Sequence, residues 1–227
     1  LAQDPSTVAV AEILNKLGGL AARRGDDAKA RTDYEAALKI VSEQLGRDHP
    51  ATAITHANLC YLDAQAGKLA DARTCQEEVL SMLERGLGPD HPQVAWALNE
   101  VALVQREQGD AAGAAARFER ALAIWQRASG PDHPDVAWPL INLGEIAIEN
   151  GDSARAGELC TRALAVLEKA SGAAHPDLIE PLICLATAKL AHARPEALAL
   201  AHRARDIAKA HNIPEPPELT QLLARGN

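Results

Sequence analysis

Apolar side chains recur at a helical spacing in the segment that begins at residue 133. The first run holds four of them at i, i+4, i+7 and i+11, on one face of a helix: Val136, Leu140, Leu143 and Ala147. A Gly-Asp pair at 151–152 breaks the pattern. A second amphipathic run then continues to Ser171-Gly172, with apolar residues at Ala156, Leu159, Ala163 and Val166. The pattern therefore predicts a helix, a tight turn and a second helix.

This unit returns along the chain with a step of 42 residues. Asp-His-Pro stands at 48–50, 90–92 and 132–134, and Ala-His-Pro follows at 174–176. An aliphatic column and a glycine column keep the same step: Leu17, Leu59, Val101, Leu143 and Leu185, and Gly25, Gly67, Gly109 and Gly151. We therefore predict an all-α chain with a single domain over 1–227 and about five helix-turn-helix repeats. The repeats are expected at 7–48, 49–90, 91–132, 133–174 and 175–215, with a C-terminal capping helix at 216–225, because terminal repeats face water on one side.

The composition favours helices throughout and excludes some classes of partner. The chain has 47 alanines, and alanine is the best helix former. The formal net charge is −8, whereas proteins that bind nucleic acids usually carry a basic stripe. No apolar run reaches the roughly 18 residues that cross a bilayer. We therefore expect no nucleic-acid partner and no membrane span.

The cysteines bear on localisation. They show neither a CxxC motif nor a paired spacing: Cys60, Cys75, Cys160 and Cys184. We expect buried free thiols in a reducing compartment, and hence a cytoplasmic protein. The chain begins at Leu1 without a charged and apolar leader, so we expect an excised or processed segment. The abundance of alanine and arginine favours a bacterial source.

The repeat resembles the tetratricopeptide repeat. The resemblance is carried by Leu98-Asn99, Val101-Ala102 and Gly109-Asp110, followed by Ala114, Phe118 and Ala121-Leu122. The long period and the stretch Leu-Gly-Pro-Asp-His-Pro-Gln-Val-Ala at 87–95 are similar to the variant typified by kinesin light chains. The resemblance implies an α-α superhelix, or solenoid, in which the first helix of each pair lines a concave groove.

Metal and catalytic sites are not expected. Four histidines share one register: His49, His91, His133 and His175. Stacked helices lie roughly 8–10 Å apart, whereas zinc holds its ligand nitrogens about 2 Å away. We therefore expect these histidines to pack and hydrogen-bond in turns, beside an Asp that is a candidate N-cap or turn former. Acidic pairs such as Glu145 and Glu149 have no neighbouring nucleophile, so we expect no catalytic residue, no metal and no cofactor.

The resemblance places ligand contacts at recurring positions of the first helices. The residues of this predicted groove are Asn58, Tyr61, Trp96, Asn99, Leu103, Arg106, Trp138, Ile141, Asn142, Glu145 and Ile148. Trp96 and Trp138 share one register, and Trp is enriched among binding hot spots. Packing of both side chains in the core stays open as an alternative, and Trp125 is expected in the core. Because Pro139 removes a helical hydrogen bond, the first helix there should start late or bend.

These features predict a non-catalytic protein–protein interaction module that binds a peptide or a partner protein in its concave groove. The alternative is a regulatory or self-associating segment of a larger signalling enzyme. The resemblance suggests a kinase, a protease or an ATPase as the attached domain. Self-association of the repeat array is open in either case.

Overall fold

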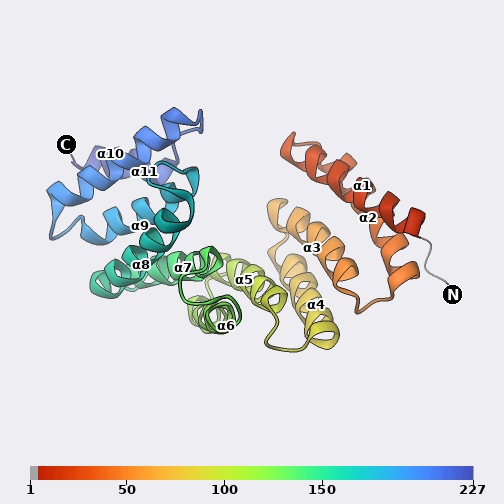
Figure 1. Cartoon of the computed structure of the whole chain (residues 1–227). Helices are drawn as coiled ribbons and strands as arrows, with labels where there is room; N and C mark the ends of the chain where they lie inside the picture. Colours follow the sequence, from red (N-terminus) through yellow and green to blue (C-terminus); the bar gives the residue numbers. More distant parts are fainter. Residues whose placement is uncertain (1–4, 227) are drawn as a thin grey trace. The chain divides into compact units, whose positions relative to one another are not determined.

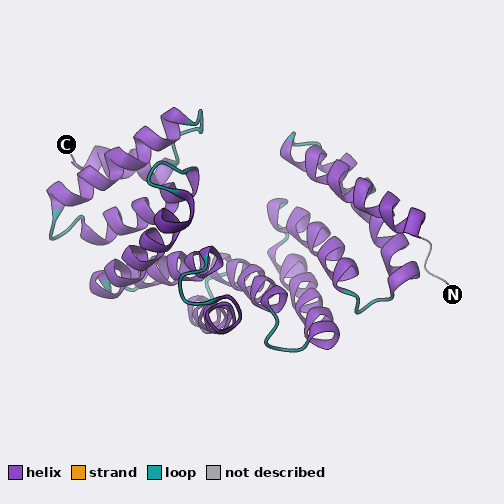
Figure 2. Cartoon of the chain, in the orientation of Figure 1, coloured by secondary structure: helices purple, strands orange, loops and turns teal. Residues whose placement is uncertain are grey.

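The described part of the chain is all-helical (Figures 1 and 2). The computed structural model describes residues 5–226, so Leu1, which motivated the expectation of a processed segment, lies outside the described residues. The α-helices within this range are α1 (Pro5–Arg23), α2 (Asp27–Leu45), α3 (Pro50–Gln65), α4 (Leu69–Leu87), α5 (Pro92–Glu107), α6 (Ala111–Ser129), α7 (Ala137–Glu149), α8 (Ser153–Ser171), α9 (Ile179–Lys189), α10 (Arg194–Ala210) and α11 (Pro217–Gly226). Two short 3₁₀ helices, η1 (Pro134–Val136) and η2 (Pro176–Leu178), precede α7 and α9. The prediction of an all-α fold is confirmed.

The helices pack as sequential antiparallel pairs in the manner of an α-solenoid. The chain divides into two compact units, Leu1–Arg117 and Phe118–Asn227. In the first unit each helix contacts the next, from α1 through α5. In the second unit the same succession runs from α7 to α10, and α11 packs against α9 and α10. Within α1–α5 of the first unit and α7–α10 of the second, helices adjacent in sequence are therefore neighbours in space, as short connections require.

Small residues allow the paired helices to approach closely. One alanine column in the second helices is completely buried: Ala30, Ala72, Ala114 and Ala156. A second column, one or two turns further along, is also completely buried: Ala37, Val79, Ala121 and Ala163. These small side chains therefore belong to the buried core of each unit.

The Gly-Asp turns join the first helix of a pair to the second. Gly25 and Gly151 adopt φ values of 75° and 77°, a left-handed conformation that suits glycine because it lacks a Cβ. The following aspartates cap the next helix: Asp26 Oδ1 accepts a hydrogen bond from Lys29 N at 3.1 Å, and Asp152 Oδ1 accepts one from Arg155 N at 3.0 Å. Each Gly-Asp pair therefore ends one helix and starts another.

The repeated histidines are N-caps: His49 and His91 cap α3 and α5, and His133 and His175 cap the short helices η1 and η2. His49 Nδ1 accepts a hydrogen bond from the backbone N–H two residues on, at 3.2 Å, and the histidines at 91, 133 and 175 do the same at 3.2–3.3 Å. The neighbouring Asp48 is not the N-cap, because its carboxylate accepts hydrogen bonds from Arg85 at 2.8 and 3.1 Å. Arg85 holds the pKa of Asp48 below its usual range through these bonds. The expected turn role of the histidines is confirmed.

Helix α7 starts late, as Pro139 requires. The segment after His133 forms η1, and α7 begins at Ala137, so Pro139 lies in the first turn, where a missing N–H breaks no helical hydrogen bond. Pro181 has the same place in α9 after η2. Of the two alternatives, a late start or a bend, the structure shows the late start.

The expectation of free cysteines is wrong. Cys60 on α3 forms a disulfide with Cys75 on α4, and Cys160 on α8 forms one with Cys184 on α9. The partners are 15 and 24 residues apart in sequence, yet their Cα atoms lie 5.5 and 5.9 Å apart because antiparallel helices bring them together. No sequence motif marks such pairs. The cysteines therefore give no support to a reducing compartment, and cytoplasmic localisation is left as a proposal.

Candidate functional site

The first-helix face of the first unit carries an exposed apolar and amide patch on α3. Ile54 and Tyr61 expose 39% and 50% of their surfaces, and Asn58 lies between them on the same helix face. We call Ile54, Asn58 and Tyr61 the α3 patch. Asn58 Nδ2 donates to Asn15 Oδ1 on α1 at 3.5 Å, and Asn15 Nδ2 donates to Thr55 Oγ1 at 2.8 Å. This amide chain joins the faces of α1 and α3 beside the patch.

The first-helix face of α5 carries partly buried side chains. Trp96, Leu103 and Arg106 each remain accessible in part. Asn99 exposes only 8% of its surface, so it packs inside the unit rather than lining an open groove. Burial raises the pKa of the adjacent Glu100 carboxyl, and a hydrogen bond from the Asn99 side chain opposes this rise. Helix α5 thus offers an indole, an aliphatic side chain and a guanidinium at the surface.

The predicted residues of α7 divide between surface and core. Trp138, Asn142 and Glu145 are partly accessible, whereas Ile141 exposes only 2% and belongs to the core. Asn142 Nδ2 donates to the Trp138 carbonyl oxygen at 2.9 Å, within the helix. Ile148 packs against a small apolar cluster made of Ala147, Ala156 and Ala188. The accessible part of this face is therefore narrower than the sequence pattern predicted.

An acidic group lies beside the first-helix face of the second unit. Burial raises the pKa of Glu180 on α9, and the negative charges of Glu145 and Asp177 raise it further. Glu180 stands one repeat after Trp138, in the same column of first-helix positions. Both the burial of Glu180 and its nearness to Glu145 and Asp177 depend on how α7, η2 and α9 pack.

The tryptophans differ in environment. Trp125 exposes only 4% of its surface and lies in the core, which confirms the prediction for it. Trp96 and Trp138 are both partly buried, so neither is enclosed as Trp125 is. Trp96 belongs to the first unit and Trp138 to the second. It therefore stays a prediction that Trp96 and Trp138 line one binding groove.

One group of side chains in the described residues has the composition of a metal site. The ligand atoms of His56, Cys60 and Cys75 lie within 4.8 Å of one another, and His56 Nε2 is 3.6 Å from Cys75 Sγ. Burial lowers the pKa of His56, which favours the neutral ring that metals bind. The two sulfurs, however, are bonded to each other and offer no thiolate. In the disulfide form this group is a structural link between α3 and α4.

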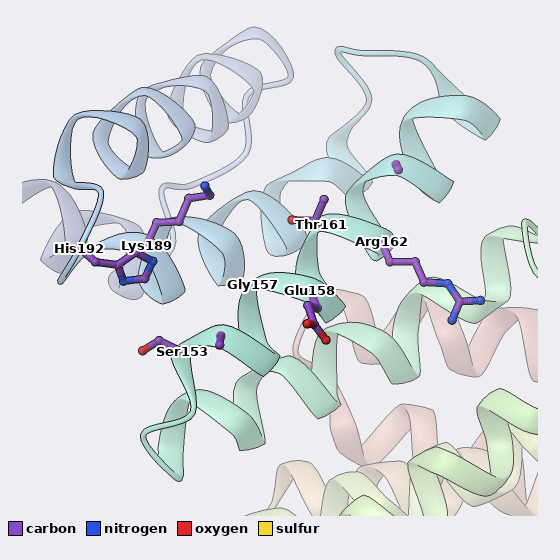
Figure 3. A pocket seen from close by; sticks show the side chains of 9 residues that line it. Ser153, Gly157, Glu158, Thr161, Arg162, Lys189 and His192 are labelled. Carbon is purple, nitrogen blue, oxygen red and sulfur yellow. The ribbon is translucent and has the colours of Figure 1, made fainter.

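A hollow of about 540 Å³ lies along the outer face of α8 (Figure 3). Glu158, Thr161 and Arg162 line it from α8, and Lys189 and His192 line it from the end of α9. Lys189 Nζ forms an ion pair with Glu196 at 2.7 Å, and Arg162 Nη2 donates to the Pro131 carbonyl oxygen at 3.4 Å. These cations therefore support the surrounding structure, and the hollow is distinct from the first-helix faces.

Comparison with known proteins identifies the fold family. The sequence profile described as "Tetratricopeptide repeat" matches residues 9–83, 56–127 and 101–156, and a second profile of the same description matches 136–177. The chain belongs to the tetratricopeptide repeat family. Tetratricopeptide repeat domains are protein-interaction modules and are typically non-catalytic. The predicted resemblance is thus confirmed, and the family implies protein partners.

Several solved structures are similar to this one. BtubC (BKLC) from P. vanneervenii is 26% identical, with a TM-score of 0.76 over 92% of this chain and 84% of that chain. A Podosopora anserina protein of the kinesin light chain type, with nearly identical TPR-like repeats, is 22% identical, with a TM-score of 0.71 over 92% and 99% of the two chains. Aspartyl phosphate phosphatase F from Bacillus subtilis is 18% identical, with a TM-score of 0.71 over 96% and 59%. No curated protein sequence matches the chain.

The similarity to kinesin light chain-like structures agrees with the long sequence period. Within residues 5–226, no helix of this tetratricopeptide repeat protein combines the length and apolar character that crossing a membrane requires. The family therefore establishes that the chain is a protein-interaction module. The place where a partner binds has to be inferred from the exposed side chains of each unit.

Proposed function

We propose that this protein is a non-catalytic module that binds a peptide or a helix of a partner protein through its first-helix faces, with the α3 patch as the anchor. The observation that carries the proposal is the exposure of Tyr61 and Ile54 on one face of α3, two turns apart. Tyr is among the residues most enriched in binding hot spots, and an aromatic ring supplies a large contact area at low entropic cost. Exposed apolar groups that flank a hydrogen-bonding amide are typical of a binding surface.

The side chains around the patch suggest how a partner is recognised. The Asn58 amide can both donate to and accept from a peptide backbone, which gives affinity without strict dependence on sequence. Arg106 on α5 contributes positive charge to the first unit. In the second unit, Glu145 lies on the same helix as Trp138 and is close enough to Glu180 on α9 to raise the pKa of that carboxyl, after burial. We therefore expect an apolar anchor residue on the partner to fit the α3 patch, with charged residues of the partner adding selectivity.

Peptide selection tests this proposal. Random peptides displayed on phage are selected on the purified protein, and the retained peptides are measured by fluorescence anisotropy against Tyr61→Ala and Ile54→Ala. We expect each change to weaken binding by about tenfold or more, since hot-spot truncations cost about 2 kcal/mol. Ile213→Ala is the matched control, because Ile213 is also an exposed apolar residue, at 36%, and follows α10.

The same selection tests the two tryptophans separately. Trp96→Ala should weaken the peptides that depend on Tyr61, because both residues lie on first helices of the first unit. Trp138→Ala tests whether the second unit contributes to the same peptides. Selected peptides that bind all four variants as tightly as the unchanged protein would contradict a first-helix binding face.

A further inference from the structure

His56 on α3 stands where the other repeats carry a leucine. The same position one repeat earlier is Leu14, and in the later repeats it is Leu98, Leu140 and Leu182. The three later leucines expose at most 2% of their surfaces. In this one repeat a half-buried imidazole takes the place of a packing residue. The packing of the repeat therefore does not require a histidine here, because a leucine fills the position elsewhere.

The imidazole lies beside two cysteines. His56 and Cys60 are one turn apart on α3, and Cys75 reaches them from α4. His56 Nε2 lies 3.6 Å from Cys75 Sγ, and the three ligand atoms lie within 4.8 Å of one another. Within residues 5–226, no other group of three His, Cys, Asp or Glu side chains is gathered in this way. We call His56, Cys60 and Cys75 the α3–α4 cluster.

The distances suit the ligands of a tetrahedral zinc ion. With Zn–S bonds of about 2.3 Å and Zn–N bonds of about 2.0–2.1 Å, a nitrogen and a sulfur ligand lie roughly 3.6 Å apart and two sulfurs roughly 3.8 Å apart. The separation of His56 Nε2 and Cys75 Sγ already has the first value. The two sulfurs share a covalent bond and can separate once it is broken. The Cα atoms of Cys60 and Cys75 are 5.5 Å apart, so rotation of the two side chains supplies this separation with the helices in place.

Reduction turns the two sulfurs into ligands. A dithiol reductant attacks the Cys60–Cys75 disulfide, gives up two electrons and two protons, and leaves as a disulfide, so that both cysteines become thiols. Zinc then displaces one proton from each thiol and binds two thiolates and the neutral imidazole, without a change in its own oxidation state. An external disulfide reverses the sequence: it takes up the two electrons with two protons, the protein disulfide forms again and the ion leaves.

We propose that the α3–α4 cluster is a zinc site that opens when the Cys60–Cys75 disulfide is reduced and closes when the disulfide forms again. His56 Nε2 and the two Sγ atoms bind the ion, and water takes the fourth position. Thiolate and imidazole ligands together suit zinc, whereas magnesium and calcium take oxygen ligands. The side chains of His56 and Cys75 are partly accessible, so an ion can reach the site from solvent.

The zinc site has a place in the module of its own. In the reduced protein the ion joins α3 to α4, as the disulfide does in the oxidised protein. At about 100° per residue, His56 and Cys60 lie on the face of α3 opposite to Ile54 and Asn58. The α3–α4 cluster is therefore separate from the α3 patch, and its metal binding does not rest on the proposed peptide binding.

The second disulfide lacks the imidazole. Glu180 stands one turn before Cys184 on α9, and Ala156 stands one turn before Cys160 on α8. Reduction of this pair supplies two thiols without a nitrogen ligand. The two disulfides of one chain therefore form a matched comparison for metal binding.

Zinc binding by the reduced protein tests the site. The C160A/C184A variant, which keeps only the Cys60–Cys75 pair, is reduced with a phosphine, which takes up the oxygen of water and leaves as its oxide. After removal of the phosphine without air, zinc is titrated by calorimetry, and cobalt(II) reports thiolate ligands by its absorption spectrum. We expect one ion per chain in the reduced variant and none before reduction. The unchanged protein is titrated in parallel, so that the result does not depend on the folding of the variant.

His56→Leu is the variant that locates the ion, because leucine fills this position in the other repeats. It keeps both thiols and should weaken zinc binding by at least about tenfold, since even changes beyond the ligands cost about 10–100-fold. Zinc at a hundredfold excess over its dissociation constant should raise the melting temperature of the reduced protein by roughly 5 °C or more. The same zinc concentration should give a smaller rise for His56→Leu, and circular dichroism checks that both proteins are helical.

Three results would overturn the proposal. The first is the absence of zinc binding by the reduced protein up to about 0.1 mM ion. The second is zinc binding that His56→Leu leaves intact, because this would assign the ion to the thiols alone. The third is equal binding before and after reduction, because this would place the ion elsewhere on the chain. Loss of the peptides that depend on Tyr61 would not bear on these outcomes, so the two sites are tested separately.

Discussion

Replacement of Gln105 by Leu should destabilise the first unit strongly. Gln105 exposes 1% of its surface, and its amide connects two charged side chains. Its Nε2 donates to Asp110 Oδ2 at 2.7 Å, and its Oε1 accepts from Arg117 Nη1 at 2.7 Å. Asp110 in turn accepts a hydrogen bond from Gly113 N at 2.9 Å at the start of α6. Gln105 thus links α5, the Gly-Asp turn and α6.

The expected cost follows from the two lost hydrogen bonds. A hydrogen bond to a charged group contributes about 1.5–3 kcal/mol, so two contribute about 3–6 kcal/mol. Leu matches Gln roughly in size and returns part of this through apolar burial, about 1–2 kcal/mol. Asp110 keeps its bond to Gly113, and Arg117 keeps an ion pair with Glu77 at 3.4 Å. We therefore expect a net loss of about 2–4 kcal/mol in the free energy of unfolding.

Gln76 is the matched control on α4. It exposes 2% of its surface, but its Oε1 has no hydrogen-bond partner among the described residues. Because a buried acceptor without a partner costs free energy, Gln76→Leu should be neutral or stabilising by about 1 kcal/mol. Urea unfolding followed by circular dichroism at 222 nm measures both variants. With a slope of about 1–3 kcal/mol per M, Gln105→Leu should lower the midpoint by about 1 M or more. A urea midpoint for Gln105→Leu equal to that of Gln76→Leu would contradict a stabilising role for the two Gln105 hydrogen bonds.

Two further predictions concern the disulfides and a buried acid. Iodoacetamide without reductant should label none of the four cysteines, and labelling before reduction would contradict the disulfides. The C60A/C75A variant should lose about 3 kcal/mol of stability, as expected for a closed loop of about 15 residues. Glu100→Gln should raise the melting temperature at pH 7, because a pKa raised by burial means that ionised Glu100 destabilises the fold. The gain should vanish below about pH 4, where Glu100 is protonated in both the folded and unfolded states; an equal gain at both pH values would contradict this cause.

The sequence was sufficient for the fold because the repeat is local. The Gly-Asp turns and the alanine columns are set by neighbours within one repeat, so their period predicts both the helices and this part of the buried core. Pro139 predicted a late helix start for the same reason, since a proline acts on its own helix. The histidine caps show the limit of this reasoning, because Asp48 is an equally good candidate until Arg85 is seen to engage it.

The site could be predicted only in part, because exposure depends on packing between helices. Tyr61, Trp96, Asn99 and Ile141 were all predicted to line the groove, yet Asn99 and Ile141 are buried. The cysteine pairs are set by contacts between helices, which no spacing rule describes. Sequence periodicity predicts which positions are equivalent between repeats, and the structure shows how exposed each of them is.

Chemical-shift mapping with a selected peptide is the most direct test of the proposal that a partner binds at the α3 patch. The ¹⁵N spectrum of the protein is recorded with and without a phage-selected peptide whose binding depends on Tyr61. We predict that the largest shifts lie at Ile54, Asn58 and Tyr61 on α3, with smaller shifts on α5. Shifts confined to the outer faces of the second helices, for example at Glu158 and Thr161 on α8, would contradict it.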